Sequence, residues 1–174
     1  MRLIILSQKG NRMVIRKSPR LKDYDYQEPG AYFVTVCVSP RRNLFWKTPI
    51  KIPDFSIPTG YLNENGNIVA ACLEQLINHR QVIHLLNFVI MPDHVHILLE
   101  HDGDDNGISM SNLVGEFKRL ASLRLRKRMK GEKIWQRSFF DRIVRNDREY
   151  QRIDDYIEAN PVNWEEDQES PDFL

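Results

Sequence analysis

Hydrophobic side chains follow a period of two in some parts of the chain and a helical period in others. Residues 30–38 are almost all β-favouring, so we predict a first strand there. The apolar runs 85–91 and 94–100 flank the turn-forming pair Pro92-Asp93 and predict two adjacent antiparallel strands. A further strand-like segment covers 135–144. Together these segments predict a single sheet.

Three other segments repeat apolar residues at helical spacing. One begins near Asn67 and is expected to run for about 13 residues. The second covers 109–130, and the third begins at the N-cap Asn146, with Glu149 as its capping-box partner, and ends before Pro161. The order strand, helix, strand, strand, helix, strand, helix predicts an α+β sandwich in which helices pack on an antiparallel sheet.

The length of 174 residues suits one domain with a hydrophobic core. Residues 1–20 read as an N-terminal arm that we expect to be poorly ordered, and residues 165–174 read as an acidic tail. No apolar run approaches the roughly 20 residues of a membrane span, and the first residues are too short for a secretory signal. We therefore expect a cytoplasmic protein that does not engage a membrane.

The residue pattern argues against disulfides, a cysteine zinc site and an EF-hand calcium loop. Cys37 and Cys72 are the only cysteines and form no CxxC pair, which argues against a disulfide framework and a cysteine zinc site. Cys37 is interpreted as a small buried hydrophobe. The acidic stretch 102–107 misses the EF-hand spacing and is interpreted as a solvated loop.

Charge is unevenly distributed although the net charge is only +1. Residues 111–152 carry 13 basic and 5 acidic side chains, whereas residues 153–174 carry 8 acidic and no basic ones. The basic block could attract a polyanion. On charge alone, a solvated helix face remains the favoured interpretation over nucleic-acid binding.

His94-Val95-His96 is the sharpest local feature of the sequence. Side chains alternate along a strand, so His94 and His96 point to one face and could share a metal ion, while Val95 points into the core. The alternative is two hydrogen-bonded core histidines. The metal interpretation is favoured, because burying polar side chains without partners costs roughly 1–3 kcal/mol each.

A two-histidine site needs a further ligand, and the last predicted helix offers one. Tyr156 and Asn160 lie four residues apart, hence on one helix face. Asn160 could supply an oxygen ligand while Tyr156 points toward the metal. On spacing alone, the simpler interpretation is favoured, in which Asn160 caps the helix and Tyr156 is half-buried core.

Several separated motifs resemble the single-tyrosine HUH transposases, in which U is a hydrophobic residue, and are closest to the REP-associated tyrosine transposases. The segments that carry the resemblance are 30–35 (GAYFVT), 88–98 (FVIMPDHVHIL), 135–141 (WQRSFFD), 143–146 (IVRN) and 155–162 (DYIEANPV). They occur in the order of the family's motifs and span most of a single catalytic transposase domain at 21–164.

The resemblance implies a ferredoxin-like core with the HUH motif on a central strand. It also implies Tyr156 as the nucleophile and His94, His96 and Asn160 as ligands of Mg²⁺ or Mn²⁺, although imidazoles would also accept zinc. The implied activity is cleavage and transfer of single-stranded DNA, on hairpin substrates, through a 5′-phosphotyrosine. Tyr150, with Asp154 four residues on, is a rival nucleophile that matches the motif less well.

DNA would be held by basic side chains on and after the second predicted helix. We predict phosphate contacts from Lys118, Arg119, Arg124, Arg126, Lys127, Arg128, Arg137, Arg142 and Arg145. Trp135, Phe139 and Phe140 could stack on bases or could equally be core.

Two other function classes remain open at this point. One is a non-catalytic nucleic-acid-binding module, and the other is a zinc hydrolase, for which the sequence offers neither an HExxH motif nor an evident third histidine. A monomer and a homodimer are both compatible with the sequence.

Overall fold

The computed structural model describes residues 28–48, 60–103, 108–162 and 164. The expected N-terminal arm, most of the acidic loop and the acidic tail therefore lie outside the described residues. The elements follow the predicted order: β1 (Gly30–Cys37), α1 (Glu64–Asn78), β2 (Ile83–Ile90), β3 (His94–His101), α2 (Met110–Leu125), β4 (Phe140–Val144) and α3 (Asp147–Ala159). Within this part of the chain, no helix has the length and apolar composition needed to cross a membrane.

The four strands form one antiparallel sheet in the order β2-β3-β1-β4. This is the strand order of a ferredoxin-like α+β sandwich, and it confirms the predicted fold class. β3, which begins with His94-Val95-His96, lies between β2 and β1, so the prediction of a central HUH strand is also confirmed. In the β1–β3 ladder Thr35 pairs with His96, which places the two side chains side by side on one face.

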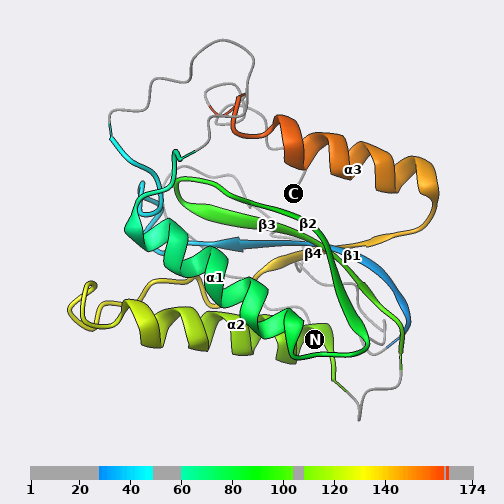
Figure 1. Ribbon diagram of the computed structural model, residues 1–174, viewed down its shortest axis with the longest axis horizontal. Helices are drawn as coiled ribbons and strands as arrows, with labels where there is room; N and C mark the ends of the chain where they lie inside the picture. The colour runs from blue at the N-terminus through cyan, green and yellow to red at the C-terminus, as the bar shows by residue number, and fades with distance from the viewer. Residues whose placement is uncertain (1–27, 49–59, 104–107, 163, 165–174) are drawn as a thin grey trace, which may run out of the picture.

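Helices cover both faces of the sheet (Figure 1). α1 and α2 lie together on one face, and α3 crosses the other. Because side chains alternate along β3, Val95, Ile97 and Leu99 point toward α1 and α2, where they are buried, as predicted for Val95. His94 and His96 point the opposite way, toward α3. The sheet thus separates a largely apolar core beneath α1 and α2 from the face that carries the histidine pair.

α2 ends earlier than its sequence pattern predicts. The helix stops at Leu125 rather than at residue 130, and the chain turns through Lys130 and Gly131, both of which have positive φ angles. Leu125 is the last residue of the buried stripe, and the basic residues that follow it are mostly exposed. Without an apolar face to bury, helical propensity alone does not extend the helix.

The predicted strand 135–144 is only half correct. β4 begins at Phe140, and the earlier part of the segment touches the sheet through a single bridge between Trp135 and Val38. Lys118 of α2 explains the break, because its ammonium donates to the carbonyl oxygens of Gln136 at 3.1 Å and Ser138 at 2.8 Å. A side chain rather than a neighbouring strand therefore satisfies these backbone groups.

The starts of α1 and α3 follow the capping residues of the sequence more closely than the end of α2 and the start of β4 follow their predicted positions. The Asn146 side chain accepts from the Glu149 backbone N–H at 2.9 Å, as predicted, although the Glu149 carboxylate accepts from the Arg145 N–H rather than from that of Asn146. α1 begins at Glu64, before the predicted Asn67, because Asn63 caps it through the Gly66 N–H. Cys37 and Cys72 are both buried and unpaired, and the burial of Cys37 agrees with its interpretation as a small buried hydrophobe.

Candidate metal and nucleophile site

His94 and His96 converge on one point beneath α3. Their Nε2 atoms lie 2.9 Å apart, and the side chains belong to residues that are only 8% and 3% exposed. This convergence follows from the strand period alone, since residues i and i+2 share a face. Two imidazoles so placed need a proton or a metal cation between their Nε2 lone pairs.

The other ring nitrogens are held by oxygen atoms. The Thr35 hydroxyl lies 2.8 Å from His96 Nδ1, and an Asp93 carboxylate oxygen lies 2.7 Å from His94 Nδ1. An ionised carboxylate can only accept, so His94 Nδ1 is the donor and its Nε2 carries the lone pair. The hydroxyl can accept in the same way from His96. Both rings can therefore present an unprotonated Nε2 to a shared cation.

Burial sets the protonation preferences of the site. Burial lowers the pKa of His96 well below its usual value, and the positive charges of His94 and Arg41 lower it further. Burial raises the pKa of Asp93, but the hydrogen bonds and charges of His94 and Arg41 outweigh this and hold it below its usual value. A neutral His96 beside an ionised Asp93 is the state that favours cation binding.

The lowered pKa of His96 predicts a pH-dependent stability. Below about pH 6.5 the unfolded chain binds a proton at His96 that the folded, metal-free protein does not, so the native state loses stability as pH falls. Between pH 6.5 and 5.5 we therefore expect His96 to lower the free energy of unfolding. Urea unfolding in chelator should show that extra loss in the wild type relative to His96→Gln. Equal losses in both proteins would contradict the assignment.

Tyr156 of α3 faces the histidine pair. Its hydroxyl lies 3.4 Å from His96 Nε2, and its ring meets those of His96 and Phe33 edge to face. Phe33 stacks in turn on His96 with ring centroids 5.2 Å apart. Packing on two sides therefore orients the phenol toward the point where the imidazoles converge.

The rival nucleophile Tyr150 lies elsewhere on the same helix. Six residues separate it from Tyr156, or roughly 9 Å along the helix axis. Asp154, its predicted metal-binding companion, accepts a 2.6 Å hydrogen bond from Asn87 of β2. The structure brings Tyr156, and not the Tyr150–Asp154 pair, to the histidines.

Asn160 is the buried polar group whose surroundings best fit a ligand role. It is 1% exposed, and neither atom of its side-chain amide has a hydrogen-bond partner within the described chain. Although the residue occupies the C-cap position of α3, its side chain does not cap the helix. A buried amide without a hydrogen-bond partner lowers the stability of the fold unless a ligand binds to it.

The position of Asn160 is bracketed by residues that touch both histidines. One turn before Asn160 on α3, Tyr156 contacts His96. Four residues after Asn160, Trp164 packs against His94 with ring centroids 5.7 Å apart. No group of three His, Cys, Asp or Glu side chains suited to a metal occurs among the described residues. An amide oxygen from Asn160 could supply a third donor, and two imidazoles with one amide oxygen suit a divalent cation.

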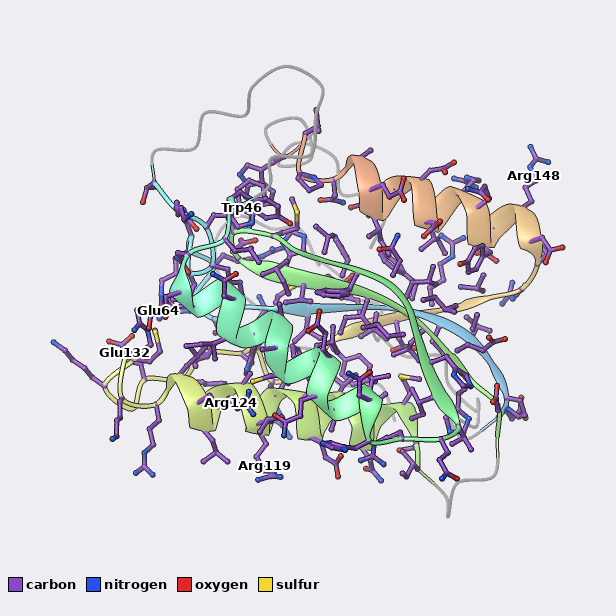
Figure 2. All side chains as sticks on the ribbon, viewed as in Figure 1. Trp46, Glu64, Arg119, Arg124, Glu132 and Arg148 are labelled. Atoms are coloured by element: carbon purple, nitrogen blue, oxygen red, sulfur yellow. The ribbon has the colours of Figure 1, made fainter. Side chains whose placement is uncertain are left out.

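The predicted DNA contacts divide between the two faces of the sheet. α2 carries Lys118, Arg119 and Arg124, and it lies on the side away from α3, as the labelled side chains of Arg119 and Arg124 show in Figure 2. Arg142 of β4 pairs across from Phe33, so it shares the face of the histidines and bonds Glu149 of α3 at 2.7 Å. A DNA strand that contacted both the α2 residues and Arg142 would have to pass around the edge of the sheet. All of these DNA contacts stay predictions.

Several of the basic residues already have partners within the chain. Lys118 is bonded to backbone carbonyls, Arg124 to Gln75 of α1, and Arg128 to Glu64 and Asn65. Within the described residues, no hydrogen bond or ion pair involves the side chains of Arg119, Arg126, Lys127, Arg137 or Arg145, and all five are exposed.

The aromatic residues proposed to stack on bases are mainly structural. Trp135 and Phe139 are buried in the hydrophobic core, where Trp135 packs against Phe45 and Phe117. For these two the core interpretation is correct. Phe140 is half-buried and lies opposite Thr35 on the histidine face, so it alone keeps the stacking role as a prediction.

Four residues of the site were not identified from the sequence: Thr35, Arg41, Asp93 and Trp164. A threonine within an otherwise apolar buried strand and an aspartate adjoining the first histidine were signals that could have been used. Arg41 and Trp164 had no such signal, because their contacts with the site join distant parts of the chain.

The fold and the site define an α+β protein in which a central two-histidine strand lies beneath a tyrosine-bearing helix. The chain belongs to the family described as IS200-like transposases, whose sequence profile matches residues 61–160, more than half of its length. It is therefore a member of a transposase family, as its motifs predicted.

The chain is also similar to individual proteins and to a solved structure. A Haemophilus influenzae protein named as a REP-associated tyrosine transposase is 28% identical over 146 residues, covering 79% of this chain and 73% of the relative. An uncharacterized protein of the same organism is 29% identical over 172 residues, covering 88% and 92%. A solved REP-associated tyrosine transposase, bound to a REP hairpin, superposes with a TM-score of 0.57 at 20% identity, covering 83% of this chain and 73% of that one.

Proposed function

We propose that this transposase cleaves and rejoins single-stranded DNA through a covalent bond between Tyr156 and a 5′-phosphate. The main support for this proposal is the geometry of three side chains. The Tyr156 hydroxyl lies 3.4 Å from Nε2 of His96, and that nitrogen lies 2.9 Å from Nε2 of His94. A nucleophile placed beside two converging imidazole donors is suited to metal-assisted phosphoryl transfer.

The chain's own residues account for the bond changes. The Tyr156 oxygen forms a bond to phosphorus as the bond from phosphorus to the 3′ oxygen breaks, and the phenol proton passes by way of solvent to the departing 3′ oxygen. The resulting phosphotyrosine diester preserves the energy of the broken linkage. Another 3′-hydroxyl can therefore reverse the step and join a new strand without ATP.

A divalent ion would be held by His94, His96 and Asn160, and Mg²⁺ or Mn²⁺ would supply Lewis-acid polarisation of the scissile phosphate. Asn160 supports this set through its buried, unpartnered amide. Asp93 and Thr35 support it by occupying the Nδ1 atoms, which leaves Nε2 of each imidazole for the ion.

The proposed substrate is single-stranded DNA flanking or forming a hairpin. The solved relative bound to a REP hairpin motivates this choice, and exposed basic residues on this chain, such as Arg119, could hold the phosphate backbone. Tyr156 and the histidines meet within one chain. We therefore propose a site that one protomer can complete, whether or not the protein forms a dimer.

Mapping of the covalent adduct tests this proposal. The full-length protein is incubated with Mn²⁺ and end-labelled single-stranded hairpin oligonucleotides, denatured, digested and analysed by mass spectrometry. We expect a nucleotide adduct on the peptide that contains Tyr156. DNA binding without an adduct across many hairpins would favour a non-catalytic module, and hydrolysis without an adduct would favour the zinc-hydrolase alternative.

A further inference from the structure

One carboxylate oxygen of Asp93 joins two positively polarised partners. Its Oδ1 lies 2.7 Å from Nδ1 of His94 and 2.9 Å from Nη1 of Arg41. Arg41 comes from the loop that follows β1, whereas Asp93 precedes β3, so the contact is made across 52 positions of sequence. The Arg41 side chain is 44% exposed and that of Asp93 only 13%, which places the carboxylate inside and the guanidinium at the rim.

The same Arg41 nitrogen also lies 3.2 Å from Nδ1 of His94. A guanidinium has donors and no acceptor, so these two nitrogen atoms can hydrogen-bond only if His94 Nδ1 has no proton. A neutral imidazole would then carry its proton on Nε2, the atom that faces His96. The carboxylate and the guanidinium therefore favour opposite tautomers of the same ring.

We propose that Asp93 is a positioning residue that holds His94 in the tautomer able to bind a cation, and that Arg41 makes this choice conditional on Asp93. The inference rests on the proposed metal site. While Asp93 is present, it accepts from both partners and Arg41 fixes the orientation of the carboxylate. Once Asp93 is removed, Arg41 becomes the nearest partner of Nδ1 and selects the tautomer that blocks the ion.

This arrangement predicts that two substitutions will not add. Asp93→Ala is expected to weaken Mn²⁺ binding by about 10–100-fold, the usual effect of losing a partner that orients a metal-bound histidine. Arg41→Met in that background is expected to recover at least about half of the loss on a logarithmic scale, because Nδ1 is released from its donor. Arg41→Met alone removes a charge but leaves Asp93 on the ring, so its effect should be small.

The measurement is the affinity of the metal-free, full-length protein for Mn²⁺ alone, from the electron paramagnetic resonance signal of free Mn²⁺. The four proteins form a double-mutant cycle in which the charge effect of Arg41 is common to both backgrounds. Asp93→Asn is the conservative control. Its amide oxygen should stay turned toward Arg41 and accept from His94, keeping affinity within about fivefold of wild type. Circular dichroism melting of each metal-free variant checks folding.

A cycle that closes additively to within about twofold would overturn the inference. So would an Asp93→Asn variant as weak as Asp93→Ala, because a tautomer effect requires only an acceptor. Wild-type protein that binds no Mn²⁺ would overturn both the metal site and this inference. If the four proteins show the predicted non-additivity in Mn²⁺ affinity but the wild type cleaves no DNA, the inference stands and the proposed function is refuted.

Discussion

Replacing Tyr156 with phenylalanine is expected to abolish the covalent protein–DNA adduct and to lower strand cleavage by on the order of 10⁴-fold or more. The substitution removes only the oxygen that would attack phosphorus. The ring that packs against His96 and Phe33 is retained, so the free energy of unfolding of the metal-free variant should lie within about 1 kcal/mol of the wild-type value. Gel quantification of adduct from labelled hairpin DNA, with a parallel urea titration, measures both effects.

Tyr150→Phe is the matched control for this experiment. Tyr150 lies on the same helix and is also half-buried, but its hydroxyl forms no hydrogen bond with His94 or His96. We expect its adduct yield to stay within about threefold of wild type. Adduct formation that survives Tyr156→Phe and disappears in Tyr150→Phe would reverse the assignment of the nucleophile.

Replacing His96 with alanine is expected to reduce Mn²⁺ affinity by more than about 100-fold and to remove detectable strand cleavage. A lost ligand should exceed the 10–100-fold effect that is usual for a group that only orients one. Its loss also leaves a cavity beside Phe33 and Tyr156 and a Thr35 hydroxyl without its partner. We therefore expect a destabilisation of about 2–4 kcal/mol in the absence of metal.

His101→Ala separates the loss of a ligand from the loss of stability. His101 is on the same strand and equally buried, but its odd position directs it to the face covered by α1 and α2. This variant should lose comparable stability and keep Mn²⁺ affinity within about threefold of wild type. Comparable losses of Mn²⁺ affinity in both variants would show that His96 contributes to folding rather than to metal binding.

Much of the architecture was predictable because it depends on local chemistry. The alternation in 94–100 is sufficient to place His94 and His96 on one face and Val95 in the core, since the strand period needs no tertiary information. The start of α3 follows in the same way from the capping side chain of Asn146. The resemblance to a known family added Tyr156 and Asn160, which helical spacing alone left as structural residues.

Other features depended on contacts between distant segments and were not predictable. The early end of α2 and the break before β4 follow from where buried surface ends and from where Lys118 finds carbonyl oxygens. The assignment of Trp135 and Phe139 to the core likewise required knowledge of what packs against them.

The histidine site shows which features the sequence determined and which required the tertiary structure. By itself the sequence determined that two imidazoles share a strand face, because side-chain direction on a strand is a local property. Only the tertiary structure decided that α3 covers this face, that α2 with its basic residues covers the other, and that Arg41 and Thr35 reach the imidazole rings. Those relations depend on strand order and on how the chain closes around the sheet, which periodicity within one segment does not specify.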